Sequence, residues 1–330
     1  MPRVIGRGDF TALAAGSLIA SVLPGCGTST DTRTAPAERT LSFRESTHTI
    51  RSIIARDAAD PAILPAALPR LYEHGKPVRH AVVLFHGFTN CPQQFDELAR
   101  LYHARGCNVY VPRIPRHGFK DRLTRALTDL STAEIEACAN DAFRVARGLG
   151  TEVSAVGLSL GASMVLWLAQ TQPIDLAIPI APFLMPAAPP DGKPIPSFAG
   201  EPAMRLLHAL PNMYWWWDLN VKERCKPDYA YPGYPTHALA ELVFFGDAIT
   251  GAAMRRKPRG RRCVLVLNDR DNAVVNDVSR NVLAHWNAHG AGYRELVLTG
   301  AGPRHDVIDP TTFPQGRTLV YPKLEALVLG

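Results

Sequence analysis

The chain has 330 residues and a formal net charge of +6, with 46% hydrophobic and 20% charged residues. A chain of this length buries a large core, and its composition excludes a disordered chain, a collagen-like fibre and a coiled coil. The longest apolar stretch, Phe10 to Leu23, is shorter than the roughly 20 residues that a membrane-spanning helix needs. We therefore expect a globular protein that is not an integral membrane protein.

The positive charge is concentrated in one short run, which alone accounts for the net charge: Arg255, Arg256, Lys257, Arg259, Arg261 and Arg262. Binding to nucleic acid needs a basic face together with base-reading or stacking groups. This run contains Pro258 and Gly260 but no aromatic residue. We expect a solvated loop and no nucleic-acid partner, with contact to an anionic membrane surface as the alternative.

The first residues have the pattern of an export signal. Arg3 and Arg7 precede the apolar run, which ends in Leu23-Pro24-Gly25-Cys26 before a polar stretch. This ending resembles a bacterial lipobox, apart from Pro24, where a small residue is usual. We expect a signal peptide at 1–25, lipidation at Cys26, a linker at 26–40 and an exported, membrane-anchored protein. The alternatives are a soluble periplasmic or secreted protein and a buried N-terminal helix.

If Cys26 carries lipid, five cysteines remain: Cys91, Cys107, Cys138, Cys225 and Cys263. In an oxidising compartment one pair could form a disulfide, but the sequence does not indicate which pair.

From Ala81 onward, short apolar or β-branched runs alternate with helical patterns. A capping box at Ser131 to Glu134 precedes a helical run over residues 135–149, and Pro92 stands at another helix start. This alternation predicts a parallel sheet covered on both faces in one α/β domain over residues 41–330. We expect strands at residues 81–85, 108–111, 154–156, 176–180, 263–267 and 293–298, and assign 41–72 only as covering structure.

The alternation breaks at about residues 182–236, which contain eleven prolines. Such proline density is incompatible with a long helix or a central strand. Because the segment directly follows a strand, we expect an inserted lid at the carboxyl edge of the sheet. Its Trp215-Trp216-Trp217 run indicates either contact with an apolar substrate or anchoring of the lid to the domain.

A Gly-x-Ser-x-Gly pattern, Gly157 to Gly161, lies between a predicted strand and an apolar helical run. At such a junction the pattern is typical of a nucleophile elbow, a tight turn that exposes the Ser159 hydroxyl and needs glycine for close backbone packing. The alternative is a glycine-rich turn that only closes a helix against a strand.

Two other predicted strands end near titratable residues. One runs into Asp269 and Asp271, and the other precedes His305 and Asp306. The carboxyl ends of parallel strands share one edge of the sheet, so an acid and a base there can meet Ser159. The order Ser, Asp, His along the chain is the order of one of the three large serine-hydrolase folds.

From about Ala81 to Pro322 the chain resembles a bacterial α/β-hydrolase of the serine esterase and lipase type. The matching motifs are His86-Gly87-Phe88-Thr89, Gly118 in Pro115-Arg116-His117-Gly118, Gly157 to Gly161, Asp271-x-x-Val274 and His305-Asp306. The resemblance implies the α/β-hydrolase fold, with a mostly parallel central sheet, helices on both faces and an inserted lid.

The resemblance also implies a catalytic triad of Ser159, Asp271 and His305. Asp271 is preferred to Asp269 because family members place the acid before an apolar-Val step. We expect Asp306 and Asp277 to be structural.

Backbone N–H groups of Phe88 and Leu160 are implied to form the oxyanion hole. His86 is an alternative base, although a residue at that strand end more often supports the loop.

These features imply a serine carboxylester hydrolase that cleaves a small-molecule ester through an acyl-enzyme, without a cofactor. The alternatives are an amidase or aminopeptidase on the same scaffold, and a non-catalytic binding protein with this fold. We expect no metal: His285 and His289 lie four residues apart on a predicted helix, but without a nearby carboxylate on it. The natural substrate and the oligomeric state are left open.

Overall fold

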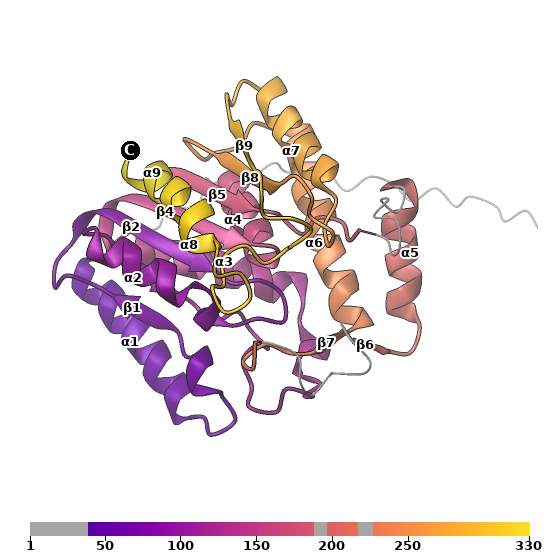
Figure 1. Ribbon diagram of the computed structural model, residues 1–330, viewed down its shortest axis with the longest axis horizontal. Coiled ribbons are helices and arrows are strands. Elements are labelled where there is room, and N and C mark those ends of the chain that lie inside the picture. The colour runs from indigo at the N-terminus through magenta and orange to yellow at the C-terminus, as the bar shows by residue number, and fades with distance from the viewer. Residues whose placement is uncertain (1–38, 188–196, 217–226) are drawn as a thin grey trace, which may run out of the picture. The chain divides into compact units, whose positions relative to one another are not determined.

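The computed structural model describes residues 39–187, 197–216 and 227–330. Residues 40–330 form one compact unit (Figure 1). The expected signal peptide, Cys26, most of the linker, Trp217 and Cys225 lie outside the described residues.

A seven-stranded sheet forms the centre of the unit (Figure 1), in the order β1-β3-β2-β4-β5-β8-β9. All neighbouring strands are parallel except β1 and β3. The strands are β1 Arg70–Tyr72, β2 Val78–Phe85, β3 Asn108–Val111, β4 Gly150–Leu158, β5 Leu176–Ile180, β8 Val264–Asn268 and β9 Arg294–Leu298. The predicted mostly parallel sheet is therefore confirmed, and β1 at its edge is an addition.

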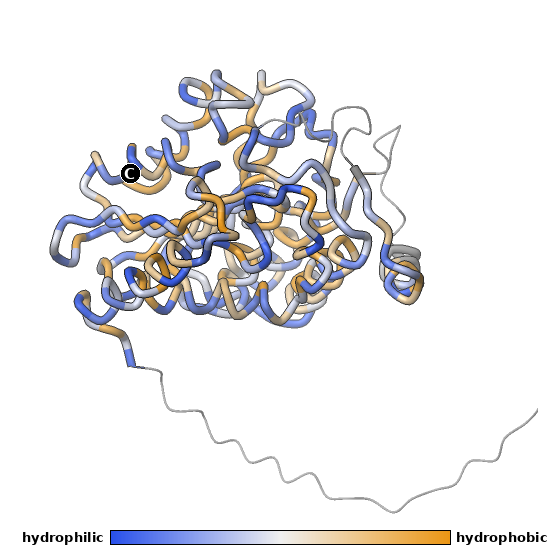
Figure 2. The backbone as a smooth tube through the Cα atoms, turned by 90° about the horizontal axis from the view of Figure 1, so that it is seen from below, coloured by the Kyte–Doolittle hydropathy of each residue, from blue (hydrophilic) through white to orange (hydrophobic). Residues whose placement is uncertain are grey.

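Helices cover both faces of this sheet because successive strand residues point to opposite sides. In β2, Val83 and Phe85 belong to one buried cluster, whereas Val82 and Leu84 belong to the other. The first face is covered by α1 Phe43–Ala59, α3 Thr132–Ala146, α4 Leu160–Thr171, α6 Thr236–Arg255 and α7 Asn276–Ala288. The second is covered by α2 Asp96–Ala104 and α9 Tyr321–Leu329, and the one-turn helix α8 Gly316–Leu319 precedes α9. The hydrophobic colour in Figure 2 accordingly follows the strands and the inner sides of the helices.

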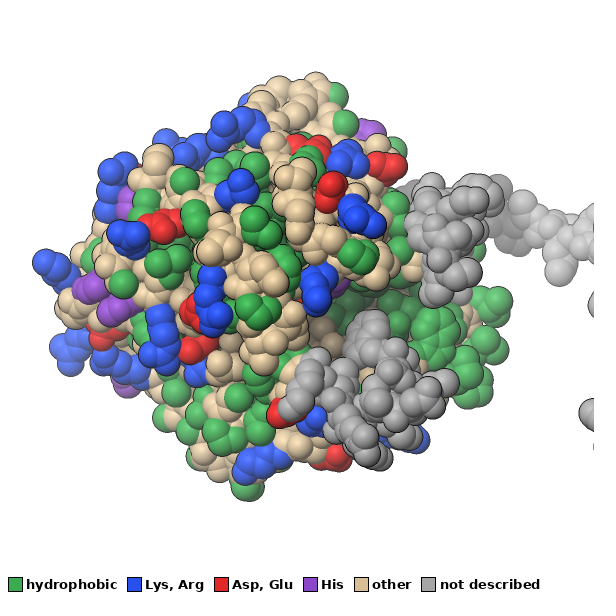
Figure 3. Space-filling model, in the orientation of Figure 1, with side chains coloured by type: hydrophobic (Ala, Val, Ile, Leu, Met, Phe, Trp, Pro, Cys, Tyr) green, Lys and Arg blue, Asp and Glu red, His purple; other side chains and the backbone are tan. Residues whose placement is uncertain are grey.

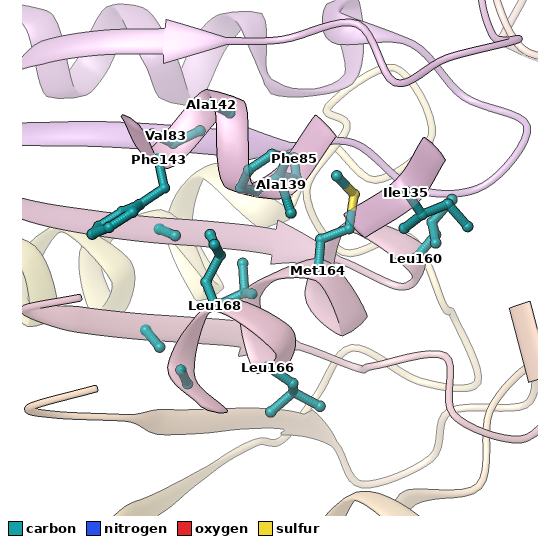
Figure 4. Close-up of a cluster of buried hydrophobic side chains, with 14 of the residues drawn as sticks. Val83, Phe85, Ile135, Ala139, Ala142, Phe143, Leu160, Met164, Leu166 and Leu168 are labelled. Carbon is teal, nitrogen blue, oxygen red and sulfur yellow. The ribbon is translucent and has the colours of Figure 1, made fainter. Parts of the chain in front are cut away.

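The helix predicted after Ser131 is α3, which begins with the expected capping box: the Ser131 side chain accepts from the Glu134 amide, and the Glu134 side chain accepts from the Ser131 amide. Its buried side packs against α4 and β2, as Figure 4 shows for side chains from these three elements. This packing holds the start of α4, and with it the turn before α4, against β2.

The segment between β5 and α6 contains a 13-residue helix, α5 Ser197–Ala209, and an antiparallel pair, β6 Tyr214–Trp216 with β7 Gly233–Pro235. The expectation that proline density excludes a long helix is therefore wrong here. Most prolines of the segment flank the helix, and only Pro202 lies inside it. Exposed apolar side chains gather over this segment (Figure 3): Leu206, Leu210, Met213 and Trp215.

The covering structure expected at residues 41–72 consists of α1, the short 3₁₀ helix η1 Pro65–Ala67 and β1. The basic run has all six charged side chains exposed, as expected, although Arg255 is the last residue of α6. It lies at the amino end of β8. None of the described helices is long and apolar enough to cross a membrane. Within the described residues, Cys91, Cys107, Cys138 and Cys263 are free thiols.

Candidate active site

The turn between β4 and α4 holds Ser159 in a strained backbone conformation, with φ 58° and ψ −117°. A non-glycine residue there costs on the order of 1–3 kcal/mol, and such strain is typical of functional turns. The backbone is packed so closely that a Cβ on Gly157 would lie 2.3 Å from the Gly161 oxygen. The glycines are therefore required by the turn, which has the tight geometry expected of an elbow.

The expected acid and base are in contact. His305 Nδ1 lies 2.9 Å from Asp271 Oδ2, and the Asp271 side chain is fully buried. The other oxygen, Oδ1, accepts from the backbone N–H groups of Ala273 at 2.8 Å and Val274 at 3.3 Å. Because a carboxylate only accepts hydrogen bonds, Nδ1 carries the proton and Nε2 keeps its lone pair.

Asp269 is exposed, and its backbone N–H bonds to Leu298 O at 3.3 Å. No side-chain hydrogen bond of Asp269 is present within the described residues. The structure therefore brings Asp271, and not Asp269, to His305.

The loop after β2 lies beside the elbow, since a Cβ on Gly87 would be 3.6 Å from Ser159 Cβ. Within the described part of the chain, the backbone N–H groups of Phe88 and Leu160 donate no hydrogen bond. Leu160 is the first residue of α4, whose N-terminus is favourable for negative charge. The two amides predicted as oxyanion donors thus belong to segments next to Ser159 and have no acceptor within the described residues.

His86 is fully buried and supports this loop. Its Nδ1–H donates to Gly87 O at 2.9 Å, and its Nε2 accepts from the Ile114 N–H at 3.1 Å. Desolvation holds the pKa of His86 well below its usual range, so the ring is neutral. With both nitrogens occupied, His86 fixes the Gly87 carbonyl and with it the opposite-facing N–H of Phe88. This arrangement leaves no nitrogen with which His86 could act as the base.

Across the described residues, no hydrogen bond joins Ser159 Oγ to His305. In enzymes without bound substrate such contacts are often long and tighten only when substrate binds. The structure thus pairs Asp271 with His305 and places Ser159 beside the Phe88 loop.

A family model described as "Alpha/beta hydrolase family" matches residues 82–314, which is most of the chain and includes all these elements. The chain belongs to the alpha/beta hydrolase family.

Solved structures from this fold resemble the chain over most of its length. One, reported for two metagenome-derived lipolytic enzymes, is 21% identical, with 81% of this chain and 98% of that chain covered and a TM-score of 0.61. The monoacylglycerol lipase of Paleococcus ferrophilus is 18% identical, with 79% and 97% covered and a TM-score of 0.56. A soluble variant of monoglyceride lipase from Saccharomyces cerevisiae is 14% identical, with 79% and 90% covered and a TM-score of 0.55. No curated protein sequence matches the chain.

Two buried residues of this alpha/beta hydrolase hold the site loops but were not expected from the sequence. Asn268, the last residue of β8, donates through Nδ2 to the carbonyls of Gly302 at 2.9 Å and Arg304 at 2.5 Å. Gln94 bonds both Gly87 and Asp306. For Asn268, the only local sign of this role was a polar residue at the end of an apolar strand. For Gln94, the local sequence contained no sign of its role.

The segment that begins at residue 227 is also tied to the loop after β2. The Tyr231 N–H donates to Thr89 O at 2.8 Å. The Tyr231 ring stacks on the His117 ring, with a distance of 6.3 Å between the ring centroids. His117 in turn contacts the Phe88 ring edge-on at 5.8 Å. The segment around Tyr231 and the loop after β2 therefore pack against each other.

His289 lies at the end of α7, and its Nε2 is 3.2 Å from Met254 O. Over the described ranges, no group of three or more His, Cys, Asp or Glu side chains is arranged to hold a metal ion.

Proposed function

We propose that this alpha/beta hydrolase is a serine carboxylester hydrolase with Ser159 as nucleophile, His305 as base and Asp271 as the orienting acid. The observation that carries the proposal is the 2.9 Å contact between His305 Nδ1 and the buried Asp271 carboxylate. It leaves Nε2 as the one ring nitrogen able to accept a proton. The elbow conformation of Ser159 supports the same assignment.

In the proposed reaction, Ser159 Oγ attacks the ester carbonyl carbon while its proton passes to His305 Nε2. Asp271 keeps the imidazole in the required tautomer and stabilises the imidazolium. The protonated His305 then donates to the leaving alcohol as the carbonyl–oxygen bond breaks. A water molecule, deprotonated by His305, hydrolyses the acyl-enzyme, which releases the carboxylic acid and restores Ser159.

The negative charge of the tetrahedral intermediate falls on the former carbonyl oxygen. The N–H groups of Phe88 and Leu160 are the donors proposed for it, and the loss of one such donor typically costs about 3 kcal/mol of transition-state stabilisation. Because the Phe88 peptide is held by His86, this donor is fixed before the charge develops. Pre-organisation of this kind avoids reorganisation during the reaction.

The proposed substrate is a small ester with an apolar acyl group. Three of the similar structures are of enzymes described as lipolytic or as monoacylglycerol lipases. In this chain, the ring centroids of Phe88 and Tyr234 lie 5.4 Å apart, and those of Trp215 and Tyr234 lie 6.3 Å apart. This aromatic row starts at the proposed oxyanion loop and extends onto the lid, where it would contact an apolar group.

A chain-length series of p-nitrophenyl esters, assayed beside aminoacyl p-nitroanilides, tests the proposal. We expect ester hydrolysis with a preference among the acyl chains, and labelling of Ser159 by a fluorophosphonate. Faster cleavage of the anilides would favour the amidase alternative. Absence of both activities and of labelling would favour a binding protein with the hydrolase fold.

We further propose that residues 1–25 direct export and that Cys26 carries a lipid anchor. The support is the charged, apolar and Leu23-Pro24-Gly25-Cys26 order of the sequence.

A further inference from the structure

A single buried side chain joins the two loops on which the proposed chemistry depends. Gln94, 2% exposed, accepts through Oε1 from the Gly87 N–H at 2.7 Å and donates through Nε2 to Asp306 Oδ2 at 2.8 Å. Gly87 directly precedes Phe88, and Asp306 directly follows His305. The bridge therefore links the oxyanion loop to the loop of the base.

The direction of each hydrogen bond in this bridge is fixed by chemistry. The Asp306 carboxylate can only accept, and its Oδ1 already accepts from the backbone N–H groups of Ile308 and Asp309, both at 3.0 Å. Oδ2 is left for the Gln94 amide, and Oε1 of the amide is then directed at the Gly87 N–H. Each polar group of the bridge has a partner, which buried groups require.

We propose that Gln94 is a positioning residue that holds the oxyanion loop and the His305 loop at a fixed separation through Asp306. This inference rests on the proposed serine hydrolase mechanism. In that mechanism, the N–H of Phe88 and Nε2 of His305 act on the same tetrahedral intermediate, so their separation matters most in the transition state. Loss of the bridge should therefore lower kcat and leave KM nearly unchanged.

The first test compares Gln94→Ala with Gln93→Ala on the best p-nitrophenyl ester. Gln93 is the neighbouring residue, but its Oε1 accepts from Arg70 Nη2 at 2.5 Å instead of bonding Gly87 or Asp306. We expect Gln94→Ala to lower kcat on the order of 10- to 100-fold, the effect of a displacement near 1 Å. KM should change less than about threefold, and Gln93→Ala should keep kcat within about twofold of the parent.

The second test exchanges donor and acceptor across the bridge. With Asp306→Asn alone, the new amide oxygen can still accept from Ile308 and Asp309, but its NH2 group then faces the NH2 group of Gln94, so two donors oppose each other. Gln94→Glu alone opposes two carboxylates. In the double variant Gln94→Glu/Asp306→Asn, the new carboxylate accepts from Gly87 and from the new amide, whose oxygen accepts from Ile308 and Asp309. All four hydrogen bonds are restored. We expect kcat of the double variant to recover to within about fivefold of the parent, well above either single variant.

Wild-type kcat in Gln94→Ala, or a double variant no better than the poorer single variant, would overturn the inference. Should Gln94→Ala fail to fold, the recovery in the double variant decides the question, with folding checked by thermal unfolding. A parent protein that neither hydrolyses esters nor reacts with fluorophosphonate would instead contradict the proposed function. An active parent with an unaffected Gln94→Ala contradicts only the role of Gln94.

Discussion

Gly161 lies against the end of β2 so closely that a Cβ on it would be 2.1 Å from the Phe85 carbonyl oxygen. Because the opposing atom is backbone, no side-chain rotation can make room. This contact sets the start of α4 beside the end of β2, where the nucleophile turn and the oxyanion loop meet.

Gly161→Ala should therefore destabilise the fold by about 3 kcal/mol or more, at or beyond the upper end of ordinary overpacking. The matched control is Gly75→Ala: Gly75 has φ 74° with nothing within 4 Å of an added Cβ. The free energy of unfolding of Gly75→Ala should fall by only about 1 kcal/mol, because of backbone strain. Urea unfolding of both variants measures the difference, and equal losses would show that the close approach is not limiting.

Ser159→Ala should abolish ester hydrolysis and fluorophosphonate labelling, because it removes the proposed attacking oxygen. The change removes one atom and adds no bulk to the strained turn, so the melting temperature should shift by only a few degrees. Activity, labelling and thermal unfolding of the same preparation give the result. Labelling that persists in the variant would remove Ser159 from the mechanism.

Asp271→Asn should lower kcat on the order of 10⁴-fold, because an amide stabilises the wrong His305 tautomer. Asp269→Asn is the control, since Asp269 is exposed and makes no described contact with His305. Steady-state kinetics of both variants provide the ranking. If Asp269→Asn were the more damaging change, the acid role would pass to Asp269.

His117 predicts a specific loss of stability in acid. Its ring is fully buried, Nδ1–H donates to Pro115 O at 2.8 Å, and desolvation lowers the pKa of His117 to about 4. Because the pKa of His117 is lower in the folded than in the unfolded protein, the unfolded chain takes up a proton first as pH falls. The contribution of the neutral His117 to the free energy of unfolding is therefore complete above the unfolded pKa of about 6.5 and is lost as pH falls toward 4. Over this pH range the free energy of unfolding should fall by roughly 3 kcal/mol from this cause.

Urea unfolding of the parent and His117→Asn at pH 7 and pH 4.5 tests this linkage. The variant should lose less stability between the two pH values than the parent does. His48→Gln, at an exposed position, should retain the parental pH dependence. Parallel curves for the parent and His117→Asn would show that His117 does not titrate on unfolding.

The proposed anchor is tested by Cys26→Ser in cells. Two or three acyl chains give stable anchoring, and without the thiol there is no site for them. The variant should therefore move from the membrane pellet to the soluble fraction, with its specific activity unchanged. Mass spectrometry of the parent N-terminus is the independent measurement. An unmodified N-terminus, or a variant that stays in the pellet, would leave a soluble secreted enzyme as the alternative.

The sequence predicted the sheet and the loops of the site because buried strands and G-x-S-x-G turns are local patterns. It predicted that the turns of Asp271 and His305 meet, since both follow parallel strands. It did not predict β1, an edge strand of three residues whose side chains are only partly buried. It also did not predict α5, because the proline count was taken over the whole segment although α5 itself contains only Pro202. Gln94 was invisible because its partner lies 212 residues away in the chain, a separation that no local pattern encodes.

The burial of the described cysteines provides a way to observe this protein opening. Burial raises the pKa of Cys107 to about 11 and that of Cys91 and Cys138 to about 12, and it also raises the pKa of Cys263. At neutral pH almost no thiolate is present in the native state, and alkylating reagents react with thiolates. Modification of the three buried thiols, Cys91, Cys107 and Cys263, must then wait for local opening, and peptide mass spectrometry would time it. The unmodified chain thus carries reporters beside η2 Pro92–Phe95, β3 and β8, able to rank which layer of the molecule loosens first.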